Sequence, residues 1–295
     1  MTARELQGFV GTAPEAHYRH FRLTKRQTAT ATKPETCRVH HGLIALGLSS
    51  VLSAPLAATA AGLNDTGQTC YDATTTLVAC TAANAGDAAP YPRQDGRYGR
   101  DAAAAAGALP KTGGGAAGFD FTALDADGNP TAPTAGATPH PCVYDHVTGL
   151  TWEVKTDDDG LRDKDWRYTW YSIDAATNGG NPGTANKPLV VCGSALTSCN
   201  TSNYIAAVNA VGLCGHQDWR LPRIQELQSI AHYGRSNPAI DTSYFPNTVA
   251  AGFWSGSTYA KNTAQAWDVF FTSSGVYTDV KNAGYLVRLV RGGPF

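Results

Sequence analysis

The second half of the chain places its apolar residues at helical spacing in two segments. Residues 202–211 follow a run of Thr, Ser and Asn that is typical of a helix start, and their apolar side chains recur three or four positions apart. Pro222 favours the first turn of a second helix, which we predict over residues 223–233 because its isoleucines and leucine fall on one face. Both helices are expected to pack one face against the rest of the domain.

Strand-like alternation surrounds these helices. Residues 147–154 (VTGLTWEV) read as a strand with a Thr-Gly turn inside it. After residue 246, apolar and polar residues alternate in short segments separated by Gly, Asn or Ser turns, which we predict as strands over residues 253–259, 266–272, 276–281 and 285–291. Two helices followed by short antiparallel strands predict an α+β domain.

Residues 61–141 differ in kind, because they are rich in Ala, Gly, Thr and Pro. Runs such as 102–107 (AAAAAG) indicate loop or linker, and only residues 119–124 look able to form a strand. We therefore predict an irregular N-terminal segment over residues 61–141, without a large core of its own. All six tryptophans follow within residues 142–295, which we take as the folded domain.

Residues 42–56 (GLIALGLSSVLSAPL) form a short apolar run that follows basic residues and precedes small ones. This is the pattern of a secretory signal, so we predict cleavage near Ala60 and a leader over residues 1–60. A secreted, periplasmic or cell-surface protein is expected.

Charge narrows the possible partners. The 295 residues carry 23 Lys and Arg against 24 Asp and Glu, a net charge of −1. Without residues 1–60, which hold seven of the basic and three of the acidic residues, the net charge is −5. This balance offers no basic surface for nucleic acid, so no nucleic-acid partner is expected. No run reaches the roughly 20 apolar residues of a membrane span.

The seven cysteines become six when Cys37 leaves with the predicted leader. An even number in an exported protein indicates disulfide bonds, and six cysteines allow 15 pairings. Two bonds would close short loops, which leaves one long-range bond, and the expected pairs are Cys70–Cys80, Cys192–Cys199 and Cys142–Cys214. A zinc site is disfavoured because no Cys-x-x-Cys motif occurs.

Catalytic motifs are absent from the sequence. Nucleophile-elbow, zinc-protease, phosphate-loop and dinucleotide-binding patterns do not occur, and the four histidines after residue 60 pair with no obvious nucleophile. The run TDDDGLRDKD at 156–165 offers carboxylates around a glycine turn, the oxygen ligands that Ca²⁺ prefers. Its spacing is not that of an EF-hand, so a solvated turn is favoured and no other cofactor is expected. A weak Ca²⁺ site would use Asp157, Asp159, Asp163 and Asp165.

The residues best suited to binding lie in residues 258–286. In the strand predicted over 266–272 the period is two, so Trp267, Val269 and Phe271 are expected in the core and the alternate residues on the surface. Rigid aromatics add contact area at low entropy cost and small polar residues adapt, so such a surface suits recognition. The expected ligand-binding residues are Lys261, Asn262, Thr263, Gln265, Asp268, Phe270, Thr272, Ser274, Tyr277, Asp279, Lys281, Asn282 and Tyr285.

Six sequence blocks, in order, give the chain a resemblance to a known family. Among them are TGLTWEVKTDDDG from residue 148, GLCGHQDWRLPRIQELQ from residue 212, and YLVRLVRGG at 285–293. Over residues 142–295 the chain resembles the Lcl C-terminal domain family. The resemblance implies a C-type-lectin-like fold of the formylglycine-generating-enzyme type. The late cysteine pair of the formylglycine-generating relatives is missing, since no cysteine follows Cys214, so their activity is not implied.

Exported relatives with this ending are similar to target proteins of diversity-generating retroelements, in which a reverse transcriptase rewrites codons near the 3′ end. The resemblance therefore implies a fixed scaffold that displays a variable surface within residues 258–286. A fixed, adhesin-like domain is the alternative.

The DWRLP block at 218–222 directly precedes the second predicted helix. We expect Trp219 to pack in the core under an Asp–Arg pair made by its neighbours Asp218 and Arg220. Arg288 and Arg291 are expected to bridge strands or cap loops.

These features predict an exported ligand-binding or adhesion-type protein that is not an enzyme. Its expected partner is a protein or glycan at a cell or phage surface. Two alternatives stay open: a secreted enzyme acting on glycan or peptide through a Ca²⁺-dependent acidic site, and a structural surface module without a ligand.

Overall fold

The computed structural model of the protein describes residues 64–68, 70–71, 77–78 and 94–293. These residues belong to one unit that spans Ala57–Phe295. The predicted leader and its cleavage position lie outside the described residues. Among the residues described, no helix is both long enough and apolar enough to cross a membrane.

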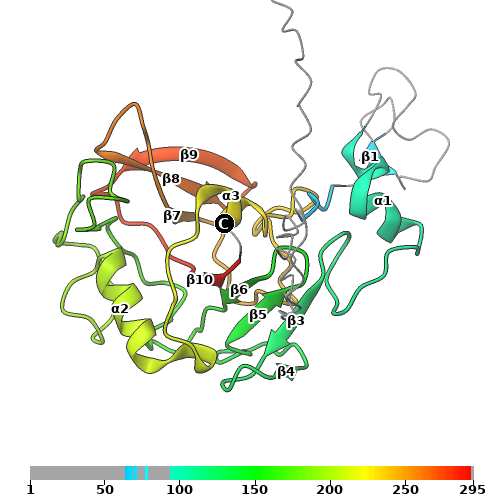
Figure 1. The fold of residues 1–295 in the computed structure, drawn as a ribbon, viewed down its shortest axis with the longest axis horizontal. Coiled ribbons are helices and arrows are strands. Elements are labelled where there is room, and N and C mark those ends of the chain that lie inside the picture. Colours follow the sequence, from blue (N-terminus) through cyan, green and yellow to red (C-terminus); the bar gives the residue numbers. More distant parts are fainter. Residues whose placement is uncertain (1–63, 69, 72–76, 79–93, 294–295) are drawn as a thin grey trace, which may run out of the picture. The chain divides into compact units, whose positions relative to one another are not determined.

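A five-stranded antiparallel sheet forms the base of the domain (Figure 1). Its strands lie in the order β10 (Val290–Gly292), β6 (Leu150–Glu153), β5 (Cys142–Asp145), β3 (Phe121–Leu124) and β4 (Pro130–Thr131). The Thr-Gly turn predicted inside residues 147–154 instead joins β5 to β6, because it directly precedes Leu150. Strand β3 confirms the strand expected at 119–124, and it pairs with β5 across the predicted domain boundary.

A three-stranded antiparallel sheet carries the predicted binding residues. It consists of β7 (Gly252–Thr258), β8 (Gln265–Phe270) and β9 (Gly275–Val280), with β8 in the centre. These strands confirm three of the predicted segments to within two residues. The fourth prediction, 285–291, is only partly right. Residues 286–290 are all at most 1% exposed, and this buried segment makes isolated bridges before it joins the sheet as β10.

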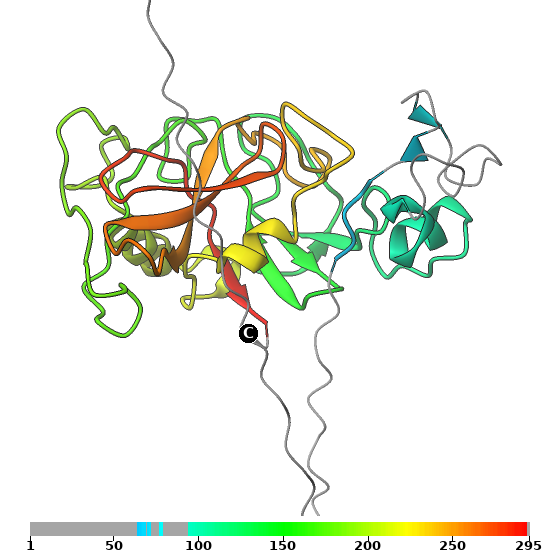
Figure 2. The same cartoon turned by 90° about the horizontal axis from the view of Figure 1, so that it is seen from above.

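Three α-helices are described, namely α1 (Gly99–Ala105), α2 (Thr201–Val211) and α3 (Ile224–Gln228). The first prediction, 202–211, is confirmed as α2. The Asn200 side chain accepts a hydrogen bond from the Asn203 backbone N–H at 2.9 Å, and Gly212 ends the helix at φ +67°. Helix α3 packs on β7 and β8 (Figures 1 and 2) and is shorter than the predicted 223–233.

Helix α1 corrects the prediction of loop over the alanine-rich run at 102–107. Alanine has the highest helix propensity, and the run follows Gly99 and the first-turn carboxylate Asp101. Two-residue strands β1 (Cys70–Tyr71) and β2 (Leu77–Val78) precede this helix and pair with each other. The segment before residue 142 therefore contains regular structure.

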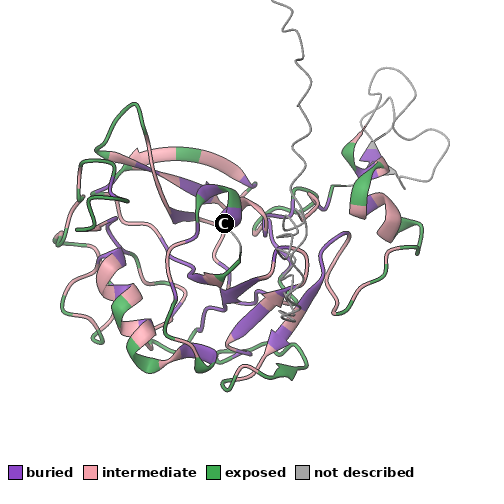
Figure 3. Ribbon diagram, viewed as in Figure 1, coloured by how far each residue is buried: buried purple, intermediate pink, exposed green. Residues whose placement is uncertain are grey.

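Two groups of buried side chains fill the domain. One lies between α3 and strands of both sheets and includes Trp152 and Phe271, while the other surrounds α2 and includes Trp170 and Trp254. Figure 3 shows buried residues concentrated along β5 and β6 and exposed residues mainly in the loops. Each large apolar side chain of this kind contributes roughly 1.5–3 kcal/mol by its burial.

The described residues contain one long-range disulfide bond and one that closes a short loop. Cys142 in β5 is bonded to Cys214 in the turn after α2, and Cys192 is bonded to Cys199 in the loop before α2. Both pairs were predicted and are confirmed. Cys70 is also disulfide-bonded, and its predicted partner Cys80 lies outside the described residues.

A fully buried ionic network ties β6 to the C-terminal segment. The Lys155 ammonium lies 3.1 Å from Glu153 Oε1 and 2.8 Å from the Tyr204 hydroxyl, which itself donates to Glu153. Arg288 donates to the backbone oxygen of Glu153 at 2.9 Å and to the Thr248 hydroxyl at 2.7 Å. Burial lowers the pKa of Lys155 to about 8. Arg288 thus links strand β6 to the loop that contains Thr248, which agrees with its predicted bridging role.

The DWRLP block is arranged differently from the prediction. Trp219 is buried, as expected, and its indole N–H donates to the Leu213 backbone oxygen. Its neighbours do not pair with each other: Arg220 forms two 2.7 Å hydrogen bonds with Glu226 of α3, and Asp218 accepts from Arg291 at 2.7 Å. The expected Asp218–Arg220 pair is therefore wrong, because each side chain reaches a partner far along the chain or on the next helix.

Candidate functional site

One surface of the three-stranded sheet brings together five of the predicted binding residues. In the β8–β9 register Asp268 lies opposite Tyr277, Phe270 opposite Gly275, and Ala266 opposite Asp279. Directly opposed residues of antiparallel strands share a face. The Tyr285 ring, which follows β9, lies against the Phe270 ring at 5.5 Å. We call this surface the aromatic–acidic face, made of Asp268, Phe270, Tyr277, Asp279 and Tyr285.

Two glycines make room for the aromatic rings of this face. Phe270 lies between Gly252 of β7 and Gly275 of β9 in the sheet register. A Cβ at Gly252 would approach the Phe270 ring to 2.8 Å and the Tyr285 ring to 2.9 Å, and a Cβ at Gly275 would approach the Tyr277 ring to 2.6 Å. The rings occupy the space that a side chain would need, so Phe270 has an edge-on aromatic neighbour on each side.

Tyr285 covers Asp268. Its ring contacts Trp254, which is opposite Asp268 on β7, and its hydroxyl donates to Asp279 Oδ2 on β9 at 2.5 Å. Asp268 is consequently 0% exposed, and neither of its carboxyl oxygens has a hydrogen-bond partner among the described residues. Burial, with the nearby negative charge of Asp279, raises the pKa of Asp268 to about 7.

The thirteen predicted binding residues fall into three exposure groups. The exposed residues are Lys261, Asn262, Thr263, Tyr277 and Asn282. The half-buried residues are Gln265, Phe270, Thr272, Asp279 and Tyr285. The buried residues are Asp268, Ser274 and Lys281. On the other side of the sheet, Val269 and Phe271 are 0% exposed, so their predicted place in the core is confirmed. Trp267, predicted with them, is partly buried and packs against the core.

The three buried residues correct the prediction that they are displayed. Asp268 is buried under Tyr285, and Ser274 is 3% exposed within the β8–β9 turn. The Lys281 ammonium donates to the backbone oxygens of Asn178 and Asn181 at 2.8 and 2.6 Å. It also lies 4.1 Å from the centre of the Trp170 ring, and burial lowers its pKa to about 8. Lys281 therefore holds a loop in place and is not part of a displayed surface.

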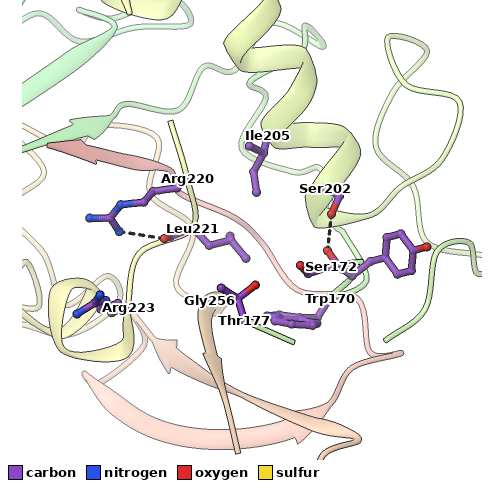
Figure 4. Close-up of a pocket in the computed structure, with 10 residues that line it drawn as sticks. Trp170, Ser172, Thr177, Ser202, Ile205, Arg220, Leu221, Arg223 and Gly256 are labelled. Carbon is purple, nitrogen blue, oxygen red and sulfur yellow. Dashed lines mark hydrogen bonds between the residues drawn. The ribbon is translucent and has the colours of Figure 1, made fainter. Parts of the chain in front are cut away.

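A second candidate site is a cavity of about 460 Å³ that the sequence did not reveal (Figure 4). Ser202 and Ile205 of α2 and Gly256 of β7 border the cavity. Trp170 and Leu221 complete its wall from two loops. These residues come from four separate segments and share no spacing pattern, so no sequence signal was present to find them.

The polar groups around this cavity are engaged in structural contacts. The Ser202 hydroxyl donates to the Tyr171 backbone oxygen at 2.6 Å, and Arg220 is held by Glu226. In Figure 4 the guanidinium groups of Arg220 and Arg223 point away from the space that Ile205 borders. The Thr177 hydroxyl donates to Asp174 Oδ2 at 3.0 Å. The arrangement can enclose a small, largely apolar group.

Comparison with known proteins identifies the family to which these sites belong. A family model described as the Lcl C-terminal domain matches residues 141–291, just over half of the chain. The chain belongs to the Lcl C-terminal domain family. The resemblance inferred from the sequence blocks is thereby confirmed. No curated protein and no solved structure matches the chain.

Both candidate sites lie within the Lcl C-terminal domain, and so does the acidic run at 156–165. The carboxylate of Asp163 is buried and accepts hydrogen bonds from the backbone N–H groups of Asp158, Asp159 and Asp165 at 2.8–2.9 Å. It therefore organises its own turn. The carboxylates of Asp157 and Asp165 both contact Lys164. Among the described residues, no three of the four predicted ligands bring their oxygens within 4.8 Å of one another.

A different trio of carboxylates precedes the Lcl C-terminal domain. Asp65, Asp95 and Asp101 offer oxygens that all lie within 4.8 Å of one another, the one group of three possible metal ligands among the described residues. Asp101 accepts a hydrogen bond from the Gly118 backbone N–H at 2.7 Å, and burial with two negative neighbours raises its pKa. Carboxylate oxygens are the ligands that hard cations such as Ca²⁺ prefer.

Proposed function

We propose that the Lcl C-terminal domain of this chain is a recognition module that binds its ligand through the aromatic–acidic face and the loops beside it, without covalent chemistry. One observation carries the proposal. A half-buried Phe270 and a 56% exposed Tyr277 stand edge to face on a rigid three-stranded sheet. Exposed aromatic groups held at fixed positions add binding area at low entropy cost.

The neighbouring loops extend this surface with polar groups. The exposed Lys261, Asn262 and Thr263 precede β8, and the backbone N–H of Lys281 donates to the Ala264 oxygen at 2.8 Å, which sets the Asn282 turn beside them. Small polar and charged groups around an aromatic centre are the usual rim of a binding surface. The ligand class proposed is a protein or glycan at a cell or phage surface.

Further features of this proposal follow from family resemblance and composition. The scaffold is proposed to be C-type-lectin-like, and the protein is proposed to be exported, non-enzymatic and independent of a cofactor. The two described disulfide bonds support an oxidising compartment. Diversification of the face by a retroelement is part of the proposal. A reverse transcriptase gene beside an imperfect repeat of codons 255–293 would support it, and flanking DNA that contains neither would leave a fixed adhesin-like module.

Binding measurements on matched variants test the central claim. The protein would be applied to a glycan array and to a displayed peptide library, and then the Tyr277→Ala and Val211→Ala variants to the ligands recovered. Both residues are exposed, at 56% and 66%, but Val211 lies on α2. We expect Tyr277→Ala to weaken binding about tenfold or more, as for an aromatic hot spot, with Val211→Ala unchanged. Equal binding by wild type and Tyr277→Ala for every ligand would refute the site.

A further inference from the structure

Asp268 is placed where a carboxylate is unfavourable. The side chain is 0% exposed, and its two oxygens have no hydrogen-bond donor among the described residues. Burying a carboxylate without a donor or counter-charge is unfavourable, so such groups in proteins are paired, protonated or functional. Asp279 is the charged group that acts on Asp268, and it has the same sign.

No described element packed around Asp268 supplies the missing positive charge. Beside Asp268, strand β7 contributes Trp254 and strand β9 contributes Tyr277 and Asp279. Tyr285 covers this face, since its ring packs on Trp254 and its hydroxyl donates to Asp279. Two basic groups of the neighbouring segments have other partners. The Arg167 guanidinium donates to the Gly284 backbone oxygen at 3.3 Å, and the Lys281 ammonium donates to the carbonyls of another loop.

We propose that the aromatic–acidic face binds an alkylammonium group, the chemistry of a lysine side chain, which lies between the tyrosine rings and against the carboxylates of Asp268 and Asp279. This inference rests on the proposed function and names the chemistry of the ligand. An ammonium supplies the hydrogen-bond donors that Asp268 lacks and a positive charge beside both carboxylates. The rings of Phe270, Tyr277 and Tyr285 add the favourable interaction of a cation with aromatic faces.

Access to Asp268 is through Tyr277. This side chain is 56% exposed and lies over Gly275, so its rotation meets no side chain on that residue. Tyr285 is held more firmly, because its hydroxyl binds Asp279 and its ring packs on Trp254. The ligand therefore enters from the β9 side, while Tyr285 remains as the opposite wall.

Binding of a cation is coupled to loss of a proton from Asp268. The pKa of Asp268 is about 7, so the carboxyl is mostly neutral at pH 6 and mostly ionised at pH 8. A cation favours the ionised form, so affinity rises with pH. For a single group with this pKa the change between pH 6 and pH 8 is about tenfold, and at pH 6 binding releases about one proton.

Calorimetric titration of the full chain in 150 mM salt tests this inference. The probes are a tetralysine peptide with blocked ends, the same peptide with every lysine acetylated, and spermidine. The variants are Asp268→Asn, Asp279→Asn and the control Asp127→Asn, which removes the same charge from an exposed turn between β3 and β4. Each titration is run at pH 6 and pH 8 in two buffers of different ionisation enthalpy, so that proton release is counted.

We expect wild type and Asp127→Asn to bind tetralysine at least tenfold more tightly than the acetylated peptide, with about tenfold higher affinity at pH 8. Asp268→Asn should bind at least tenfold more weakly and lose the pH dependence, and Asp279→Asn should also bind more weakly. Binding of tetralysine but not spermidine identifies a protein side chain as the source of the ammonium, and equal binding identifies a free polyamine. Near-ultraviolet circular dichroism confirms that each variant is folded.

Unchanged tetralysine binding by Asp268→Asn, or equal affinity for the acetylated peptide, would overturn the inference. The proposed function has a separate outcome. If tetralysine and spermidine do not bind but an array ligand depends on Tyr277, the ammonium inference fails and the recognition module stands. If no ligand depends on Tyr277 either, both fail.

Discussion

At the scale of single residues, Asp268 connects the candidate site to the stability of the fold. Its pKa rises from 3.8 in the unfolded chain to about 7 in the folded protein. The folded state therefore retains a proton between these values that the unfolded state has lost. The contribution of Asp268 to the free energy of unfolding is fully present below about pH 4. It decreases as the pH rises and is lost above about pH 7.

Replacing Asp268 with asparagine should stabilise the protein at high pH. The neutral amide removes the buried charge and its repulsion by Asp279, so we expect the free energy of unfolding at pH 8 to rise by on the order of 1–3 kcal/mol. At pH 4 the carboxyl is protonated in the fold, and the gain should nearly vanish. Urea unfolding at both pH values measures the difference, with Asp127→Asn as the exposed control. A destabilised Asp268→Asn at pH 8 would show that the carboxylate has a structural partner.

The alternation of apolar and polar residues predicted which side of the strand is core, but not that later segments bury Asp268 and Lys281. Alternation along β8 correctly placed Val269 and Phe271 in the core. It could not show that Tyr285 folds back over Asp268, or that Lys281 is drawn under a distant loop. A period of two tells which side of a strand a residue faces, but not which later segment covers that side.

At the scale of elements, the two glycines flanking Phe270 are not equivalent. Gly252 of β7 faces rings that are themselves packed, because Tyr285 contacts both Trp254 and Phe270. Gly275 of β9 faces Tyr277, which is more than half exposed. A methyl group at Gly252 must displace a packed cluster of rings, whereas a methyl group at Gly275 displaces one exposed ring, that of Tyr277.

The Gly252→Ala and Gly275→Ala variants should therefore separate in stability. We expect Gly252→Ala to cost about 1–3 kcal/mol through overpacking. Gly275→Ala should change the free energy of unfolding by less than about 1 kcal/mol, since a strand alanine also loses less backbone entropy than glycine. Its near-ultraviolet circular dichroism should change as Tyr277 moves. Chemical unfolding of both variants in parallel is the measurement, and equal costs would contradict the packing described for Phe270.

Local signals in the sequence explain which elements were predicted well. Helix α2 has an Asn200 cap at its start and Gly212 at its end, and both signals are readable without the fold. Helix α3 ends at Gln228, five residues before the predicted end, because the apolar pattern continues into buried residues that are no longer helical. Burial produces the same spacing whether or not the helix continues, so this end could not be read from periodicity.

At the scale of the whole molecule, the folded domain extends beyond the boundary expected at residue 142. Strand β3 pairs with β5 over four residues, and Phe119 and Phe121 are 1% exposed in the same core group as Trp152. The match to the Lcl C-terminal domain begins at residue 141, after β3 and directly before β5. Composition predicted an irregular segment over residues 61–141 because the glycines and alanines around β3 conceal a short apolar stretch that completes the sheet.

Fragments that start on either side of β3 test this extension. A fragment of residues 111–295 retains β3, β4 and the hydrogen bonds from the Thr112 and Gly113 backbones to Asp120. A fragment of residues 142–295 loses both strands and both phenylalanines, and removing one buried phenylalanine side chain typically costs 3–5 kcal/mol. We expect the longer fragment to unfold cooperatively in urea by tryptophan fluorescence, and the shorter one to lack a cooperative transition or to unfold at much lower urea. Equal midpoints would show that the domain is complete from β5 onward, and the β3–β5 pairing would then be an addition to a core that stands without it.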